Sequence, residues 1–269
     1  MSDSLGIIAG NGEFPLLLAR TARAQGLRTV AAAFEGETDP EITRVADEVE
    51  WVRIGQLHRL IEVFTRRHVT RAVMAGGITP ANLYKNLSLD FRMIAVAARL
   101  KIRNAQTIFG AIAEECAKDG VMLLDPRPFL GDAVPQRGPL TRRVPAAEEQ
   151  DDIAFGFPIA KAVAGLDIGQ TVVVKRGTVL AVEAFEGSDE CIQRGGQLAG
   201  EKGGAVVVKV AKPNHDFRFD IPCVGRRTIE SCVAGRIAVL AVEAGATLLL
   251  DRPGVLAAAE QNRLAVVAQ

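Results

Sequence analysis

The stretch Leu5-Gly6-Ile7-Ile8-Ala9-Gly10-Asn11-Gly12 decides the fold class of this chain. Its apolar run is typical of a strand that is buried on both faces of a parallel sheet. The glycines break the run, and residues 16–23 then predict a helix that ends at Gly26. A second strand is expected at residues 29–34. The order strand, glycine turn, helix, strand predicts a parallel sheet with right-handed crossovers.

The same alternation continues through the first half of the chain. We expect helices at 57–67, 90–100 and 106–119 and strands at 72–75 and 121–124. These elements predict a Rossmann-like N-terminal domain over residues 1–130. Five prolines and two glycines then crowd into residues 126–145, where little periodicity remains. We therefore expect a linker at residues 131–149.

The second half is also α/β, but it contains an antiparallel signal. Arg176-Gly177 separates two β-rich runs, which predicts a tight hairpin. The other expected elements are helices at 152–164, 189–198 and 228–244, a short helix after 254, and strands at 205–210, 247–250 and 264–267. We expect a C-terminal α/β domain with a mixed sheet over residues 150–269.

Composition excludes several classes of protein. The 269 residues carry 32 Lys and Arg against 32 Asp and Glu, and 48% of them are hydrophobic. Such a chain is not a disordered protein, and it has no basic excess with which to bind nucleic acid. Four cysteines without a CxxC pair, no signal-peptide pattern and no long apolar run predict a cytoplasmic protein.

Two glycine turns are candidates for ligand binding. Gly10-Asn11-Gly12 lies between a strand and a helix, where free amides suit phosphate. A dinucleotide fingerprint requires a third glycine at position 15, where this chain has Pro15, although Glu35 is placed to bind a ribose. A plain strand-to-helix connection is the alternative. Gly76-Gly77-Ile78-Thr79-Pro80 follows another strand, so we expect both turns to face one crevice.

Charged residues concentrate in the stretch 209–222. Lys209, Lys212 and Arg218 suit phosphate oxygens, and Asp216 and Asp220 suit Mg²⁺. The alternation of polar and apolar residues in 217–221 predicts that Arg218 and Asp220 share one face of an extended segment. A solvated loop with surface ion pairs is the alternative. We assign no catalytic role to His215.

A second acidic cluster runs from Glu183 to Asp189. Ser188 is expected to cap the helix that follows, and Asp189 favours its first turn. The acids of this cluster could instead complete a metal or ribose site. The chain has no GxSxG, GxxxxGK[ST] or HExxH motif, so serine hydrolases, P-loop NTPases and zinc proteases are poorly supported.

Taken together, these motifs resemble those of a known family, the LpxI-type UDP-2,3-diacylglucosamine pyrophosphatases of lipid A biosynthesis. The resemblance rests on residues 5–15, 166–170, 180–189, 212–213, 218–222 and 224–225, which span nearly the whole chain in order. It implies a two-domain enzyme that cleaves UDP-2,3-diacylglucosamine to UMP and 2,3-diacylglucosamine 1-phosphate (lipid X). Water attacks the α-phosphorus in this reaction, and a divalent metal, Mg²⁺ or Mn²⁺, assists.

The resemblance also implies roles for particular residues. The family's key aspartate corresponds to Asp220, which we expect to be catalytic and, with Asp189, to hold the metal. Substrate contacts are expected at Gly10, Asn11, Gly12, Gly76, Gly77, Thr79, Gly187, Ser188, Asp189, Lys209, Lys212, Arg218 and Thr228. Arg226, Arg227, His215 and Asp216 receive no defined role. A homodimer in peripheral contact with the cytoplasmic face of the inner membrane is also expected.

Two other functions remain open at this point. One is an NAD(P)-dependent oxidoreductase with an atypical Rossmann fingerprint, against which Pro15 counts. The other is a non-catalytic protein that binds a nucleotide sugar or a lipid. Cofactor absorbance or NAD titration would test the first, and metal-dependent release of UMP would separate the second from a pyrophosphatase.

Overall fold

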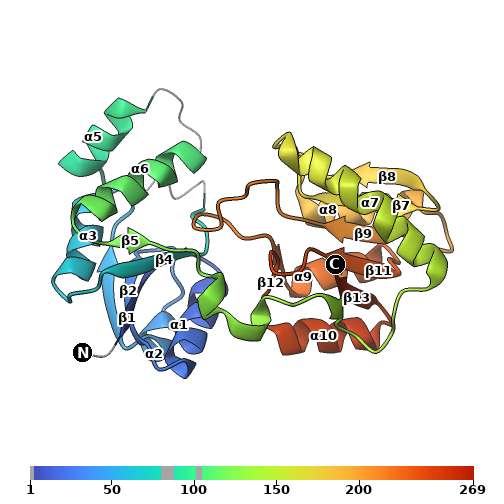
Figure 1. Ribbon diagram of the computed structural model, residues 1–269, viewed down its shortest axis with the longest axis horizontal. Coiled ribbons are helices and arrows are strands. Elements are labelled where there is room, and N and C mark those ends of the chain that lie inside the picture. Colours follow the sequence, from blue (N-terminus) through green and yellow to red (C-terminus); the bar gives the residue numbers. More distant parts are fainter. Residues whose placement is uncertain (1–2, 80–87, 101–104) are drawn as a thin grey trace. The chain divides into compact units, whose positions relative to one another are not determined.

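The computed structural model describes residues 3–79, 88–100 and 105–269. The chain forms two compact units (Figure 1). The N-terminal unit comprises Met1–Gly131 together with Asp216–Asp220, and the C-terminal unit comprises Asp132–His215 and Ile221–Gln269. Among the described residues, no helix is long and apolar enough to cross a membrane.

The N-terminal unit is built on a five-stranded sheet of order β3-β2-β1-β4-β5, with all neighbours parallel. Its strands are β1 (Ser4–Ala9), β2 (Arg28–Phe34), β3 (Glu48–Val52), β4 (Arg71–Ala75) and β5 (Met122–Leu123). Its helices are α1 (Phe14–Ala24), α2 (Ile42–Val45), α3 (Leu57–Thr65), α5 (Phe91–Arg99) and α6 (Ala105–Lys118), followed by the 3-10 turn η1 (Arg127–Phe129). The predicted parallel α/β architecture is confirmed. Gly6 is required in β1 because a Cβ there would lie 2.8 Å from the Phe64 ring.

The C-terminal unit has a mixed sheet of order β6-β13-β11-β9-β7-β8, as predicted, and a small second sheet of β10 and β12. Its strands are β6 (Gly138–Pro139), β7 (Thr171–Lys175), β8 (Thr178–Val182), β9 (Val206–Lys209), β10 (Cys223–Val224), β11 (Val239–Val242), β12 (Leu248–Leu249) and β13 (Ala265–Ala268). Its helices are α7 (Ala147–Gly165), α8 (Ser188–Leu198), α9 (Arg226–Ala234) and α10 (Arg252–Gln261), and the 3-10 turn η2 (Gly131–Ala133) spans the boundary between the units.

The predicted hairpin joins β7 and β8. Its two turn residues have left-handed φ angles, +50° at Arg176 and +68° at Gly177. The buried carboxylate of Asp152 accepts hydrogen bonds from both turn amides at 2.8 Å. This side chain on α7 therefore fixes the turn that pairs the two antiparallel strands.

The helix expected over 228–244 is wrong. Helix α9 ends at Ala234, and Arg236 turns the chain with a φ of +50° before β11 begins at Val239. Periodicity alone cannot distinguish a fully buried strand from a buried helix, and β11 lies between two neighbours in the middle of the sheet. Gly196 of α8 must be glycine because a Cβ there would lie 2.2 Å from the carbonyl oxygen of Gly235, just before this turn.

The linker expected at residues 131–149 is in large part an ordered edge of the C-terminal unit. Strand β6 pairs antiparallel with β13, and the Leu140 amide donates to the Val266 carbonyl at 2.9 Å. Thr141 continues the pairing through its hydroxyl, which accepts from the Val266 amide at 2.9 Å. Prolines are tolerated here because an edge strand has one unpaired side.

Candidate functional site

The two glycine turns lie against each other at the carboxyl edge of the N-terminal sheet. The Asn11 amide donates to the Gly77 carbonyl at 2.8 Å, and the Gly10 amide donates to the Ala75 carbonyl at 2.8 Å. A Cβ on Gly10 would lie 2.2 Å from the Gly77 oxygen, and a Cβ on Gly76 would lie 2.2 Å from the Asn11 oxygen. Glycine is needed at both positions because the two backbones touch.

Glu37 joins the two turns through its side chain. This carboxylate, only 9% exposed, accepts hydrogen bonds from Asn11 Nδ2 at 2.8 Å, from the Thr79 amide at 3.0 Å and from Thr79 Oγ1 at 3.0 Å. The sequence pointed instead to Glu35, whose carboxylate pairs with Arg53 at the surface. No motif marks Glu37, because it follows β2 and its two partners, Asn11 and Thr79, follow β1 and β4.

The segment Asp216–Asp220 packs on the N-terminal unit, although the residues on both sides of it belong to the C-terminal unit. The Phe219 ring packs against the N-terminal core, with its centroid 6.1 Å from that of Phe109 on α6. The Arg127 guanidinium lies 3.5 Å from the centroid of the Phe217 ring. Two aromatic anchors therefore hold the segment that carries Asp220, an arrangement that neither predicted domain boundary anticipated.

The predicted extended conformation of residues 217–221 is wrong. Residues 217–219 form a turn, closed by a hydrogen bond from the Phe219 amide to the Asp216 carbonyl at 3.2 Å. The Arg218 guanidinium binds the Asp216 carboxylate through two nitrogens, at 2.9 and 2.7 Å, and this hydrogen bonding raises the pKa of Arg218. Asp220 is exposed where the turn ends.

Lys209 lies in the C-terminal unit, at the carboxyl end of β9, and is only 8% exposed. Its Nζ donates to Ser188 Oγ at 2.8 Å, and that hydroxyl lies 2.9 Å from Thr171 Oγ1. The expected capping role of Ser188 is wrong: Gly187, with a φ of +86°, occupies the N-cap position, so Ser188 is the first residue of α8. The structure thus brings two predicted residues together and adds Thr171, which sequence reasoning missed.

Three other predicted residues lie in the first turns of helices or after a strand of the C-terminal unit. Asp189 lies in the first turn of α8, and its Oδ2 is 3.7 Å from Arg227 Nε. Thr228 is buried in the first turn of α9, which follows Gly225. Lys212 Nζ binds the Asp167 carboxylate at 3.0 Å, so its charge is already paired.

Glu243 is a second acid that sequence reasoning missed. Its Oε2 accepts from the Ala211 amide at 2.8 Å, and its carboxylate pairs with Lys161 at 2.9 Å. Val242, the residue before it, is the last residue of β11, and β11 pairs with β9. Glu243 therefore fixes the backbone that follows Lys209.

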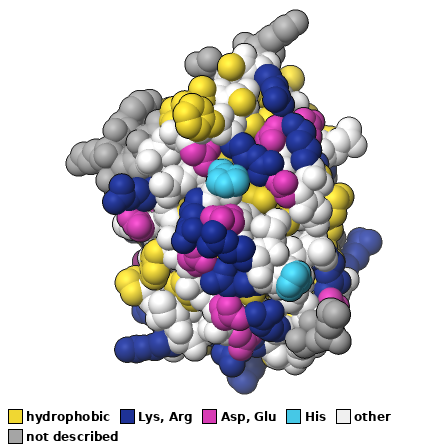
Figure 2. Space-filling model, turned by 90° about the vertical axis from the view of Figure 1, so that its left-hand side faces the viewer, with side chains coloured by type: hydrophobic (Ala, Val, Ile, Leu, Met, Phe, Trp, Pro, Cys, Tyr) yellow, Lys and Arg dark blue, Asp and Glu magenta, His cyan; other side chains and the backbone are white. Residues whose placement is uncertain are grey.

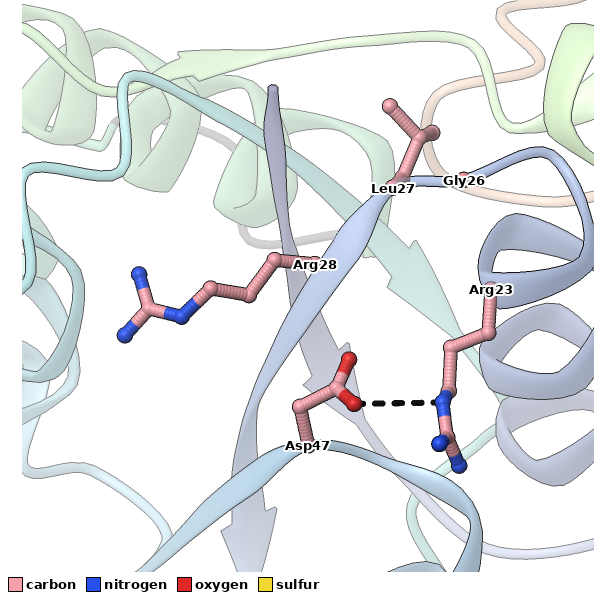
Figure 3. A pocket seen from close by; sticks show the side chains of 5 residues that line it. All are labelled: Arg23, Gly26, Leu27, Arg28 and Asp47. Carbon is pink, nitrogen blue, oxygen red and sulfur yellow. Dashed lines mark ion pairs between the residues drawn. The ribbon is translucent and has the colours of Figure 1, made fainter. Parts of the chain in front are cut away.

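A pocket of about 360 Å³ lies elsewhere in the N-terminal unit (Figure 3). It is lined by Arg23, Gly26, Leu27, Arg28 and Asp47, where the chain enters β2, and Figure 3 shows the ion pair between Arg23 and Asp47. Burial, which alone would raise the pKa of Asp47, is outweighed by hydrogen bonds from Thr29, so that pKa is lowered. None of the predicted site residues lines this pocket.

Comparison with known proteins gives the family. Sequence models of the LpxI N-terminal and C-terminal domains match residues 4–133 and 136–267. The chain belongs to the LpxI family. A relative from Caulobacter vibrioides, named UDP-2,3-diacylglucosamine pyrophosphatase LpxI, is 30% identical over 274 residues, which cover 98% of this chain and 96% of the relative.

Two solved structures are distantly similar to this LpxI-family chain. The biotin carboxylase domain of Hydrogenobacter thermophilus 2-oxoglutarate carboxylase has a TM-score of 0.30 at 16% identity, over 66% of this chain and 36% of that one. N5-carboxyaminoimidazole synthetase from Staphylococcus aureus has a TM-score of 0.26 at 17% identity, over 69% and 42% of the two chains.

Proposed function

We propose that this protein hydrolyses the pyrophosphate of UDP-2,3-diacylglucosamine to UMP and lipid X in lipid A biosynthesis, with water attacking the α-phosphorus. The observation that carries the proposal is the match of both LpxI domains across the chain, together with the name of the Caulobacter relative. The half-formed dinucleotide fingerprint at Gly10–Gly12 gives the oxidoreductase alternative no comparable support.

Asp220 is the proposed catalytic carboxylate. It is exposed, and the residue before it is packed into the N-terminal core, so its backbone has a fixed position. From there it would orient the attacking water and accept a proton or hold a metal ion. Holding a reacting group in place is among the larger contributions that a protein makes to catalysis.

The chain's acids fit a metal ion that arrives with the substrate. Among the described residues, no group of three His, Cys, Asp or Glu side chains could hold an ion. Mg²⁺ commonly binds through one or two carboxylates plus substrate phosphates and water, so the exposed Asp220 of the N-terminal unit suits it, and Asp189 is the candidate ligand in the C-terminal unit. When bound, the ion would neutralise charge on the pyrophosphate.

Lys209 is the first candidate for binding a phosphate oxygen. Its ammonium is nearly buried, so its charge is weakly screened, and only one of its three N–H donors is needed for Ser188. The free amides at the starts of α8 and α9, beside Ser188 and Thr228, add positive potential. Lys212 and Arg218 are the second candidates for binding a phosphate oxygen, because each already pairs with a carboxylate. In the N-terminal unit, the glycine turns 10–12 and 76–77, with Thr79, are the candidate substrate contacts.

The replacement Asp220→Asn tests the proposal. We expect UMP release from detergent-dispersed substrate, followed by chromatography with and without Mg²⁺ or Mn²⁺, to fall at least about 100-fold. Asp132→Asn is the matched control, because that carboxylate is 85% exposed and pairs only loosely with Arg252. Turnover near that of the wild type in folded Asp220→Asn protein would refute the assignment. Absence of UMP release by the wild type, with or without metal, would refute the function.

We also propose that the protein is a cytoplasmic homodimer that meets its substrate at the inner membrane. Light scattering of the purified chain, whose monomer mass is 28.7 kDa, tests the dimer. A mass of one protomer at working concentration would contradict it.

A further inference from the structure

Polar side chains from three elements meet at Ser188 in the C-terminal unit. Thr171 on β7 and Lys209 on β9 pair in register, so their side chains lie on the same face of the sheet. Helix α8 covers this face, because a Cβ on Gly195 would lie 2.5 Å from the Cβ of Val173 in β7. Ser188 begins this helix, and its Oγ lies 2.8 Å from Lys209 Nζ and 2.9 Å from Thr171 Oγ1.

Burial determines the direction of both hydrogen bonds. A lysine ammonium has three donors and no acceptor, so Lys209 is the donor to Ser188. Thr171 is fully buried, and in the described part of the chain Ser188 Oγ is the one hydrogen-bond partner of its hydroxyl. If Ser188 donated this second bond, the buried Thr171 proton would have no acceptor, which is costly. Thr171 is therefore a donor to Ser188 as well.

Two donors leave Ser188 with a single remaining capacity. A serine hydroxyl has one proton and two lone pairs, and here both lone pairs accept, one from Thr171 and one from Lys209. The serine proton must then point away from both partners. Because Ser188 is half-buried, a ligand can reach this proton. The hydroxyl can donate to that ligand, but it has no lone pair left for a ligand donor or a metal ion.

The charge beside this hydroxyl indicates which acceptor it suits. Lys209 is only 8% exposed, and among the described residues no carboxylate forms an ion pair with it. In the N-terminal unit, by contrast, Arg28 and Arg67 both bind the Glu48 carboxylate, and Figure 2 shows Lys and Arg side chains adjoining Asp and Glu side chains on the face of that unit. A buried ammonium beside a hydroxyl donor suits an anionic oxygen, such as that of a phosphate.

We propose that Thr171 is a positioning residue, which by donating to Ser188 leaves the serine proton for a phosphate oxygen of the substrate. That the phosphate belongs to a pyrophosphate rests on the proposed function. Ser188 and Lys209 touch the phosphate directly in this arrangement, and Thr171 acts only through Ser188. The same arrangement selects against a sugar or amide group that would have to donate to Ser188.

Calorimetric titration of the full chain with inorganic pyrophosphate, in buffer without metal, tests the role of the threonine hydroxyl. Thr171→Val keeps the shape of the side chain but removes the donor, and should weaken binding about threefold to tenfold. Thr171→Ser keeps the donor and should bind nearly as the wild type does. A packing role predicts the opposite order, because valine fills the buried site better than serine does.

Thr247→Val is the matched control for loss of a buried hydroxyl. Thr247 is also fully buried in the C-terminal unit, and its Oγ1 has no hydrogen-bond partner among the described residues. This variant should bind pyrophosphate as the wild type does. Absence of binding by the wild type overturns the proposal. So does equal binding by Thr171→Val and the wild type, or weaker binding by Thr171→Ser than by Thr171→Val.

A double-mutant cycle tests whether Thr171 acts through Ser188. In a Ser188→Ala background, Thr171→Val should cause no further loss of pyrophosphate binding, because the proton that it orients is already gone. The same severalfold loss in both backgrounds overturns the proposal. Thermal unfolding shows that each variant is folded at the temperature of the titration. Since this binding needs no turnover, failure of UMP release by the wild type refutes the proposed function without deciding the role of Thr171.

Discussion

At the scale of single residues, Glu37 is the side chain on which the glycine turns depend. Glu37→Ala should lower the free energy of unfolding by about 2–3 kcal/mol, because Asn11 and Thr79 lose the carboxylate that accepts their hydrogen bonds. Glu35→Ala, which removes an exposed ion pair with Arg53, should change it by about 0.5 kcal/mol or less. Urea unfolding of both variants checks this. Equal changes in the free energy of unfolding for the two variants would show that Glu37 does not stabilise the glycine turns.

The contrast between Glu37 and Ser188 shows what sequence reasoning reaches at this scale. Ser188 was singled out because a serine before a helical pattern is informative, but the expected role as a cap is wrong. Its actual partners, Lys209 and Thr171, come from two other strands. Glu37 carried no signal at all. Residue types near a turn are predictable from local sequence, whereas partners that depend on tertiary packing are not.

At the scale of elements, the segment Asp216–Asp220 is the feature with the clearest consequence for activity. Phe219→Ala should lower kcat at least about tenfold with a smaller effect on KM, because Asp220 follows directly and loses its anchored position. Phe219→Leu should restore most of the loss by filling the same space. UMP release kinetics measure both. Phe155→Ala, at a partly exposed ring on α7, is the control.

Phe219 is a positioning residue in this account, so the outcome must separate position from stability. Thermal unfolding of Phe219→Ala and Phe155→Ala is therefore compared at the temperature of the assay. A folded Phe219→Ala variant with the kcat of the wild type would contradict the anchoring role. If Phe219→Ala loses activity only in proportion to the fraction of protein that is unfolded, the anchoring role is contradicted as well.

Element types were predictable where the hydrophobic period was unambiguous. The strands at 4–9, 28–34 and 71–75 and most helices lie where the sequence placed them. Strand β3 was missed, because two of the five residues in its Glu-Val-Glu-Trp-Val sequence are charged. Glu48 and Glu50 suit an edge strand, where Arg67 binds both carboxylates and charge discourages pairing with another chain.

At the scale of the whole molecule, the described acids with lowered pKa values concentrate in the N-terminal unit. Hydrogen bonds from Arg28 and Arg67 hold the pKa of Glu48 below its ordinary value, and a hydrogen bond from Lys118 does so for Glu115. A carboxylate whose pKa is lower in the folded state contributes stability above its unfolded pKa of about 4.5, and that contribution is lost as the pH falls further. Acid should therefore weaken the N-terminal unit.

The pH dependence of unfolding tests this argument. The free energy of unfolding of the wild type should be nearly level from pH 7 to about pH 5 and should fall below about pH 4.5. Glu48→Gln should be less stable at neutral pH and should show a shallower fall, because one of the titrating groups is gone. High salt should also reduce the fall, since these pairs are partly exposed and are screened. Urea unfolding across this pH range measures all three. Identical slopes for the wild type and Glu48→Gln, at low and at high salt, would show that the arginine-bound carboxylates do not determine acid stability.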